Sequence, residues 1–336
     1  MKQPSVLSPQ SSPLRQGFAG RAVLITGGAG FIGSHLSAFA LRKGYRVIVI
    51  DNLITGREEN LANLHSNPNF TFIKADITKL QANQPPLFTF NFPLSHVFHL
   101  ASPASPPKYQ HWPIETLRVN SLGTELMLEL AKNNQARFIY ASTSEVYGDP
   151  AIHPQVETYW GNVNSFGPRS CYDEAKRYGE AMCYTYLNNF NVDVRVARIF
   201  NTYGPHMDPT DGRVISNLVN QAIKNKPLTI YGDGTQTRSF CYVADLVKGL
   251  WKLATKEVTG EVINLGNPNE ITMDQVAEII KDLSESKSEI IYKALPADDP
   301  KRRQPDISKA KQLLDWQPEV KLEDGLLKTI KYFRQL

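Results

Sequence analysis

The sequence predicts an α/β protein in which helices cover both faces of a doubly wound parallel sheet, followed by a smaller C-terminal α/β domain. Short apolar runs alternate with helical stretches along the first 200 residues, a pattern typical of βαβ units. A glycine-rich segment separates the first apolar run from the first helical stretch. Beyond about residue 202, glycine and proline become denser and the expected strands shorter, which indicates a second domain.

The expected elements begin at Arg21. Strands are predicted at 22–26, 46–50, 70–73, 96–100, 138–141 and 192–199, and helices at 35–43 and 113–133. Pro113 suits the first turn of its helix, where the missing N–H would have no partner in any case. A further helix at 240–253 and a strand at 262–265 are expected to return to the main sheet.

The domain organisation follows from these elements. We expect a flexible tail rich in Ser, Pro and Gln at 1–20, a first domain at 21–202 and a second domain at 203–336, with about 240–265 rejoining the first. The Pro-rich segment 81–92 is predicted to be a surface loop. A length of 336 residues agrees with about two domains.

Composition and charge exclude several classes of protein. A net charge of only +4, with the basic residues scattered, disfavours a nucleic-acid-binding protein. Three cysteines without a CxxC pair favour a reducing compartment, hence the cytoplasm, over a disulfide framework or a zinc site. The seven histidines form no HExxH motif, so no metal is expected. No apolar run approaches the roughly 20 residues of a membrane span.

The glycine-rich segment is T-G-G-A-G-F-I-G, residues 26–33. Its glycines allow a tight turn, a close approach of backbone N–H groups to a pyrophosphate, and close packing of helix on strand. Asp51 closes the second strand about 20 residues later, where a carboxylate accepts ribose hydroxyls. This is the Rossmann dinucleotide pattern, and the carboxylate favours NAD, although the nearby Arg57 leaves NADP open. A P-loop ATPase is excluded because Ser34-His35 replaces the required lysine.

Tyr172 and Lys176 lie four residues apart in a predicted helix, so their side chains share one face. Of the 14 tyrosines, only Tyr172 has a lysine four residues later. An ammonium group and an oxidised nicotinamide beside the phenol would lower its pKa from about 10 and make it a usable base. The alternative is a solvent-exposed helical pair without a catalytic role.

A hydroxyl-rich segment follows the strand at 138–141. Thr143, Ser144 and Glu145 lie at the carboxyl end of that strand, where doubly wound sheets open onto their ligand crevice. Hydroxyl groups there can hydrogen-bond a sugar, and Glu145 can act as an acid or a base. The alternative is that these residues only cap the next helix.

Longer runs carry a resemblance that covers nearly all residues from Arg21 onward. They are HLASPASPPKY (99–109), ASTSEVYGDP (141–150), WGNVNSFGPRSCYDEAKR (160–177), RVARIFNTYGP (195–205), DGRVISN (211–217) and NLGNPNE (264–270). Together with the glycine segment and the Tyr-x-x-x-Lys pair, they resemble the UDP-glucuronate decarboxylases, or UDP-xylose synthases, of the extended short-chain dehydrogenase/reductase family. The resemblance implies a Rossmann domain that binds NAD and a second domain that binds a nucleotide sugar.

The resemblance also implies a reaction. Tyr172 would remove the proton of the sugar C4 hydroxyl while hydride passes to NAD, Lys176 would lower the tyrosine pKa and hold the nicotinamide ribose, and Thr143 would bind the C4 oxygen. The resulting β-keto acid loses CO2 to leave an enolate, and protonation of the enolate at C5 followed by return of the hydride gives UDP-xylose with NAD regenerated in place. Glu145 and Arg238 match positions associated with decarboxylation, and their division of labour stays open.

Further binding residues are implied by the same likeness. The substrate residues implied are Tyr109, Ser144, Asn201, Arg213, Tyr231 and Arg303. The cofactor residues implied, besides Tyr172 and Lys176, are Gly27, Gly30, Phe31, Ile32, Gly33, Asp51, Asn52, Thr55, Gly56, Asp76, Ile77, Leu100, Ala101, Ser102 and Thr202. Two features depart from the expected pattern: the segment 81–92 is longer, and His206 replaces an arginine after Y-G-P.

Other functions stay open as alternatives. A UDP-hexose or UDP-uronate 4-epimerase usually lacks the acid at position 145, and a nucleotide-sugar 4,6-dehydratase is expected to have Asp in place of Ser144. A cofactor-binding protein without catalysis is disfavoured by the intact Tyr172, Lys176 and Thr143. We expect a homodimer, because relatives pair two long helices that correspond to 113–133 and 172–189. The apolar stripes on these helices could instead face the chain's own sheet.

Overall fold

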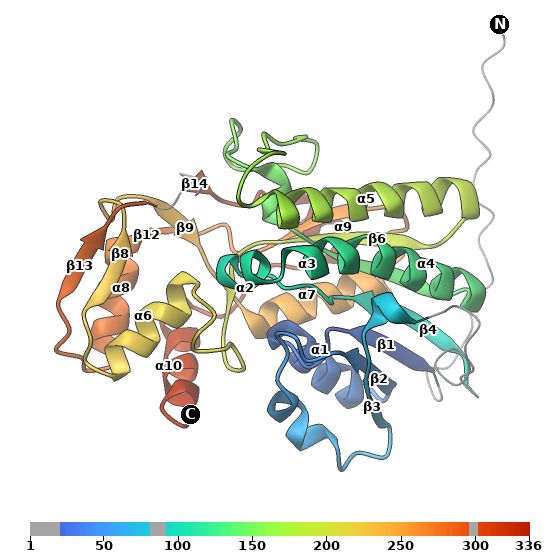
Figure 1. The fold of residues 1–336 in the computed structure, drawn as a ribbon, viewed down its shortest axis with the longest axis horizontal. Helices are drawn as coiled ribbons and strands as arrows, with labels where there is room; N and C mark the ends of the chain where they lie inside the picture. The colour runs from blue at the N-terminus through green and yellow to red at the C-terminus, as the bar shows by residue number, and fades with distance from the viewer. Residues whose placement is uncertain (1–20, 81–91, 296–301) are drawn as a thin grey trace, which may run out of the picture.

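The computed structural model describes residues 21–80, 92–295 and 302–336. Its centre is a seven-stranded parallel sheet with the order β11-β6-β5-β4-β1-β2-β3 (Figure 1). The strands are β1 (Ala22–Thr26), β2 (Arg46–Asp51), β3 (Phe70–Lys74), β4 (Leu94–His99), β5 (Arg137–Thr143), β6 (Val194–Ile199) and β11 (Val262–Leu265). The predicted fold class is confirmed. The chain order reverses beside β1, which creates a crevice at the carboxyl ends of the strands.

Helices cover both faces of this sheet. One face carries α1 (Phe31–Arg42) and α7 (Val243–Thr255), and the other carries α3 (Pro113–Asn120), α4 (Leu122–Asn134) and α5 (Ser170–Phe190). Alternate strand residues point to opposite faces: Val23 and Ile25 belong to the core under α1 and α7, whereas Leu24 belongs to the core under α4 and α5. Burial on both sides explains why these strands are continuous apolar runs.

A second region, at the left of Figure 1, is built from short strands and three helices. Its strand pairs are β8 (Leu228–Tyr231) with β13 (Ile290–Lys293), β9 (Thr237–Ser239) with β12 (Glu270–Thr272) and β14 (Arg302–Arg303), and β7 (Thr202–Tyr203) with β10 (Cys241–Tyr242). Its helices are α6 (Val214–Ile223), α8 (Met273–Leu283) and α10 (Leu322–Phe333). Between these elements, α7 and β11 return to the central sheet, and α9 (Ser308–Leu314) packs on β11.

Several observed boundaries differ from the predicted ones. The helix predicted at 113–133 is divided at Ser121, whose hydroxyl donates to the carbonyl oxygen of Leu117 at 2.7 Å, a bond that bends helices. Helix α1 begins at Phe31, before the predicted start, because the helix forms directly after the glycine turn. Shorter elements complete the chain: α2 (Pro106–His111) and the 3₁₀ helices Glu58–Leu64, Ile77–Lys79 and Ser144–Tyr147.

Two predictions cannot be compared with the fold. The predicted tail, 1–20, and nearly all of the predicted loop, 81–92, lie outside the described residues. Among the residues that the structure describes, no helix combines the length and apolar character needed to cross a membrane.

Candidate active site

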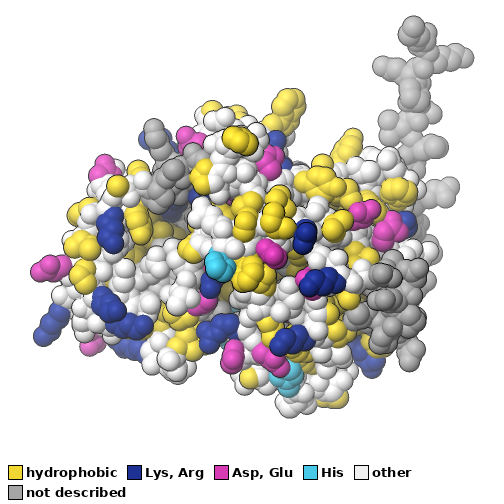
Figure 2. All heavy atoms as spheres, in the orientation of Figure 1, with side chains coloured by type: hydrophobic (Ala, Val, Ile, Leu, Met, Phe, Trp, Pro, Cys, Tyr) yellow, Lys and Arg dark blue, Asp and Glu magenta, His cyan; other side chains and the backbone are white. Residues whose placement is uncertain are grey.

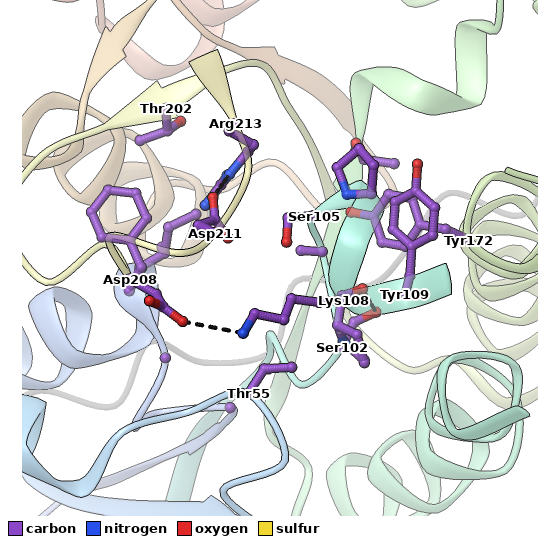
Figure 3. Close-up of a pocket in the computed structure, with 18 of the residues that line it drawn as sticks. Thr55, Ser102, Ser105, Lys108, Tyr109, Tyr172, Thr202, Asp208, Asp211 and Arg213 are labelled. Atoms are coloured by element: carbon purple, nitrogen blue, oxygen red, sulfur yellow. Dashed lines mark hydrogen bonds and ion pairs between the residues drawn. The ribbon is translucent and has the colours of Figure 1, made fainter. Parts of the chain in front are cut away.

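A cavity of about 670 Å³ opens at the carboxyl ends of the central strands, between the sheet and the second region. Its wall includes every residue that the sequence predicted to contact cofactor or substrate, from the glycine segment of β1–α1 to Arg303 of β14. Figure 3 shows side chains from both regions pointing into the cavity, among them Tyr172 from the sheet side and Arg213 from the other. One continuous cavity can therefore receive a dinucleotide and a nucleotide sugar together.

The glycine turn leaves room for a phosphate at the start of α1. Gly27 has a φ of +70°, which favours glycine. A Cβ atom on Gly33 would lie 2.2 Å from the carbonyl oxygen of Gly27, so a side chain there would force the helix away from the turn. The unpaired N–H groups at the start of α1 consequently face the cavity and can bind an anion.

Asp51 ends β2 beside the same turn and is 8% exposed. Its two carboxylate oxygens accept hydrogen bonds from the backbone N–H of Ala29 at 3.0 Å and of Leu53 at 2.8 Å. Burial raises the pKa of Asp51, and these two bonds lower it. The carboxylate is thus fixed at the cavity wall where a ribose hydroxyl can donate to it.

Tyr172 and Lys176 lie together in the first turns of α5, and both are buried. The Lys176 ammonium donates to the carbonyl oxygen of Ala141 at 2.8 Å, and its nitrogen lies 5.9 Å from the centre of the Tyr172 ring. A side-chain hydrogen bond joins Tyr172 to Thr143 at the end of β5. The structure thus brings together the three residues predicted to act at the sugar C4 position.

Burial controls the protonation of this pair in the protein alone. It raises the pKa of Tyr172 above its ordinary value, although the Thr143 hydrogen bond acts in the opposite direction. Burial also lowers the pKa of Lys176 to about 7. The phenol is therefore protonated in the protein alone, and the phenolate predicted from the sequence concerns the protein with an oxidised nicotinamide beside the phenol.

Two arginines enclose the carboxylate of Glu145. Arg303 donates to it through both Nη atoms, one of them at 2.9 Å from Oε2, and Arg169 donates to the same Oε2 through Nη2. Burial alone would raise the pKa of Glu145, but Arg303 and Arg169 lower it to about 2. Glu145 is thus a fixed anion within a buried charge cluster. Bidentate arginine contacts of this kind define orientation as well as charge.

The sequence predicted no contact partner for Glu145. Arg303 was expected to bind the substrate pyrophosphate, and Arg238 was expected to act with Glu145. Arg238 lies beside Arg303 on the neighbouring strand β9, and its Nη1 donates to the carbonyl oxygen of Thr237 at 2.8 Å. Arg169 was missed, although it stands three residues before Tyr172 inside a run already recognised. Its role depends on a contact with a residue 24 positions away, which no local pattern reports.

Buried hydroxyl groups without partners mark the place of a ligand. The Tyr109 ring stacks on Tyr172, with centroids 4.9 Å apart and planes 5° from parallel. The Tyr109 hydroxyl and the Ser105 hydroxyl are buried and have no hydrogen-bond partner among the described residues. Both side chains line the cavity, and Figure 3 shows Tyr109 beside Tyr172. Because buried polar atoms normally find partners, these two are free to bind a polar ligand.

Two ion pairs lie on the wall of the cavity, and one of them joins its two sides. Lys108 of α2 reaches across to Asp208 at 3.2 Å, the contact drawn in Figure 3. Arg213, at the start of α6, pairs with Asp211. Tyr231 ends β8 and is 41% exposed, as suits a ring that can stack on a base.

Comparisons with known proteins show the family to which the chain belongs. The family model described as GDP-mannose 4,6 dehydratase matches residues 24–329. UDP-glucuronic acid decarboxylase 1 of Xenopus tropicalis is 52% identical over 315 residues, which are 94% of this chain and 72% of that protein. The chain belongs to the UDP-glucuronic acid decarboxylase family. The predicted membership of the extended short-chain dehydrogenases/reductases is thereby confirmed.

Solved structures of other enzymes resemble this member of the decarboxylase family over nearly the whole length of its chain. UDP-glucose 4-epimerase from Thermotoga maritima, solved with UDP-glucose, has a TM-score of 0.85 and 31% identity, over 94% of this chain and 99% of that chain. UDP-glucuronic acid 4-epimerase from Bacillus cereus, solved with UDP-glucuronic acid and NAD, has a TM-score of 0.83 and 31% identity, with the same coverage.

His206 is a departure from the arginine expected in a UDP-glucuronic acid decarboxylase. It has a φ of +69°, its Nδ1 lies 2.9 Å from the Ser34 hydroxyl, and its ring lies 4.7 Å from that of His35. Burial first, then the charges of His35 and Arg57, lower the pKa of His206 to about 4. At neutral pH this position therefore lacks the positive charge that an arginine would bring to the cavity.

Proposed function

We propose that the protein is an NAD-dependent carboxy-lyase that converts UDP-glucuronate to UDP-xylose and CO2. The observation that carries the proposal is the ionised Glu145, bound by Arg303 and Arg169, in the same cavity as Tyr172, Lys176 and Thr143. A base at the sugar C4 hydroxyl and a charge cluster nearby are the two elements that oxidation followed by decarboxylation requires. The 52% identity to a UDP-glucuronic acid decarboxylase supports the same function.

The residues of the β1–α1 turn fit NAD as the cofactor. The close packing of Gly33 on Gly27 brings the start of α1 to the cavity, where its N–H groups suit a pyrophosphate, and the fixed Asp51 carboxylate suits an unphosphorylated ribose. Gly27, Phe31, Asp76, Ser102 and other cavity residues named above would surround it. Bound NAD supplies a hydride acceptor at sugar C4 and returns the hydride at the end of the cycle.

Tyr172 would accept the proton of the C4 hydroxyl. The Thr143 hydrogen bond already favours its phenolate, and the Arg213 charge acts in the same direction. Lys176 is held by the Ala141 carbonyl at a distance from which its ammonium can bind a ribose hydroxyl and stabilise the phenolate. Tyr109, stacked on Tyr172, would bind the substrate through its free hydroxyl.

The charge cluster would act on the carboxylate of the sugar. Because Glu145 stays ionised, it disfavours the anionic ground state of a nearby carboxylate. Arg303 and Arg238 lie on adjacent strands and would stabilise the enolate that remains after CO2 has left. On the UDP side, Arg213 and Asn201 would bind the pyrophosphate and Tyr231 the uracil, so that residues 203–336 serve mainly the substrate and residues 21–202 mainly NAD.

A turnover assay tests this function. Incubation with UDP-glucuronate and NAD is expected to release CO2 and to give UDP-xylose in the NMR spectrum of the products. No net NADH should accumulate, because the hydride is returned. Formation of UDP-galacturonate without CO2 would instead establish a 4-epimerase, the activity named for the Bacillus cereus neighbour. A 4-keto-6-deoxy sugar formed from dTDP-glucose would establish a dehydratase.

We propose that the chain forms a homodimer through α3, α4 and α5. Ile114, Leu117, Leu122 and Tyr178 are 41–53% exposed on these helices, and Figure 2 shows apolar side chains gathered over them. Exposed apolar clusters of this kind are typical of interfaces.

An interface charge tests the dimer. Leu122→Glu is expected to convert the dimer to a monomer in size-exclusion chromatography with light scattering, because it places a charge in the apolar contact. Leu327→Glu is the matched control, since Leu327 is 47% exposed on α10, away from this face. A monomeric parent protein, or a dimeric Leu122→Glu variant, would argue against this interface.

We also propose that the protein works in the cytoplasm. Cys171, Cys183 and Cys241 are all free thiols, and Cys183 and Cys241 are buried. Unpaired cysteines suit a reducing compartment.

A further inference from the structure

Asp173 is a buried carboxylate that the roles assigned so far do not use. It lies in the first turn of α5, directly after Tyr172, and is 6% exposed. Its Oδ2 is 3.7 Å from Nε of Arg169, and its Oδ1 is buried without a hydrogen-bond partner among the described residues. An ionised carboxylate is costly to bury, so the ion pair between Asp173 and Arg169 needs an explanation in terms of function.

Arg169 connects this carboxylate to Glu145. Its Nε faces Asp173, one helical turn later, while its Nη2 donates to Oε2 of Glu145 in the 3₁₀ helix that follows β5. Because the guanidinium group is planar and rigid, the contacts of Nε with Asp173 and of Nη2 with Glu145 together fix its orientation. The orientation of Glu145 on the side of Arg169 thus depends on where Asp173 holds the guanidinium.

Arg303, which binds Glu145 from the other side, lies on a much shorter element than Asp173 does. Arg303 comes from β14, a strand of two residues, 158 positions further along the chain. Asp173, by contrast, belongs to the 21-residue helix that also carries Tyr172 and Lys176. A contact from Asp173 through Arg169 therefore ties Glu145 to the same rigid element as the C4 base.

We propose that Asp173 is a positioning residue that, through Arg169, holds Glu145 in a fixed position relative to Tyr172. The inference rests on the proposed decarboxylase function. It concerns the step after C4 oxidation, since Glu145 acts on the sugar carboxylate and not on the C4 hydroxyl. A misplacement of catalytic groups by about 1 Å can reduce a rate by about a hundredfold, so loss of this contact should be visible in kcat.

The protonation state of Asp173 offers a second way to test the proposal, through the pH dependence of kcat. Burial raises the pKa of Asp173 to about 7, Glu145 adds to the rise, and Arg169 and Arg303 oppose it. Glu174 on the same helix acts upward as well, and the thiol of Cys171 and the phenols of Tyr109 and Tyr172 also face it. As the pH falls through 7, Asp173 takes up a proton and its attraction for Arg169 weakens, so kcat should fall on the acid side.

Two neighbouring groups of the site do not account for such an acid limb. Glu145, whose pKa is lowered to about 2 by its two arginines against the effect of burial, titrates far below this range. Lys176, whose pKa burial lowers to about 7, loses its proton as the pH rises and therefore affects the alkaline side. Tyr172 must be ionised to accept the C4 proton and can add an acid limb of its own. The change in the acid limb that Asp173→Asn causes is therefore the part that belongs to Asp173.

The test compares Asp173→Asn with the parent enzyme between pH 5.5 and 9. We expect kcat for CO2 release to fall by about ten- to a hundredfold at pH 8, with KM within about twofold, and the acid limb to move away from pH 7. Glu174→Gln is the matched control, because the adjacent Glu174 pairs at the surface with Arg177 at 3.4 Å. It should leave kcat at pH 8 unchanged and move the acid limb only slightly to lower pH, since Glu174 raises the pKa of Asp173. Calorimetric binding of UDP-glucuronate, expected to be retained, shows that the variant is folded.

A double-mutant cycle and a second variant of Asp173 distinguish the possible reasons for a negative result. In an Arg169→Gln background, Asp173→Asn is expected to cause little further loss, because its effect passes through Arg169. If Asp173→Asn does not fold, Asp173→Glu decides: a lowered kcat with a displaced acid limb supports the role, and a parental profile overturns it. A parent enzyme that releases no CO2 contradicts the proposed function. A parent that turns over, with Asp173→Asn matching it in kcat and pH profile, contradicts only the role of Asp173.

Discussion

Tyr172→Phe is expected to reduce CO2 release from UDP-glucuronate by about a thousandfold or more, because the site then has no base for the C4 hydroxyl. The ring remains, so its stacking on Tyr109, with planes 5° apart, and the packing of α5 should be retained. Binding of NAD and UDP-glucuronate, measured by calorimetry, is therefore expected to change by less than about threefold. The loss should appear in kcat, and no ketonic intermediate should form.

The control for this variant removes a hydroxyl from the same helix. Tyr184 is 70% exposed on α5, and Tyr184→Phe is expected to leave both turnover and binding at the parental level. A Tyr172→Phe variant that kept more than a tenth of the parental kcat would remove Tyr172 as the base. In that case Lys176, the other titratable group on this face, would be the next candidate.

Glu145→Gln is expected to lower decarboxylation by about a hundredfold or more and to destabilise the fold. Arg303 and Arg169 would lose the anion that they share, although Arg169 keeps its ion pair with Asp173. Since the pKa of Glu145 lies at about 2 against 4.5 for an ordinary glutamate, its ionisation contributes about 3 kcal/mol to stability. Because the folded-state pKa is the lower one, this contribution is present above pH 4.5 and is lost as the pH falls toward 2.

Denaturant unfolding at pH 7 measures the predicted loss of stability in Glu145→Gln. The free energy of unfolding should fall by about 3 kcal/mol in Glu145→Gln, and the difference from the parent should shrink as the pH is lowered through 4.5. Glu257→Gln is the control, since Glu257 is an exposed partner of Arg137 and should contribute less than about 1 kcal/mol. Equal stability of Glu145→Gln and the parent at pH 7 would show that the cluster does not stabilise the fold.

Much of the central sheet could be predicted from the sequence because its signals are local. The strand at 22–26 was placed correctly, since residues buried on both faces give a continuous apolar run. The glycine turn could be recognised because close backbone contacts at Gly27 and Gly33 tolerate no side chain. The division at Ser121 was not predictable from periodicity, since apolar residues continue on both sides of it and the bend comes from one hydroxyl bond.

The candidate site was predictable only where its residues follow one another closely. Tyr172 and Lys176 share a helix face, and Thr143 stands at a strand end, so spacing alone places them near the cavity. Arg303 and Glu145 are 158 residues apart, and their pairing depends on how the second region folds over the sheet. The buried contact between Tyr109 and Tyr172, from α2 and α5, was likewise beyond any local pattern.

The separation of Glu145 from Arg303 has a consequence for synthesis of the chain. Ribosomes add about 5–20 residues per second, so 158 residues take about 8–30 s. During that interval the α1–α5 half of the sheet can fold, while Glu145 still lacks the partner that lowers its pKa most strongly. The nascent protein should therefore acquire its cofactor crevice first, and its charge cluster only when β14 leaves the exit tunnel.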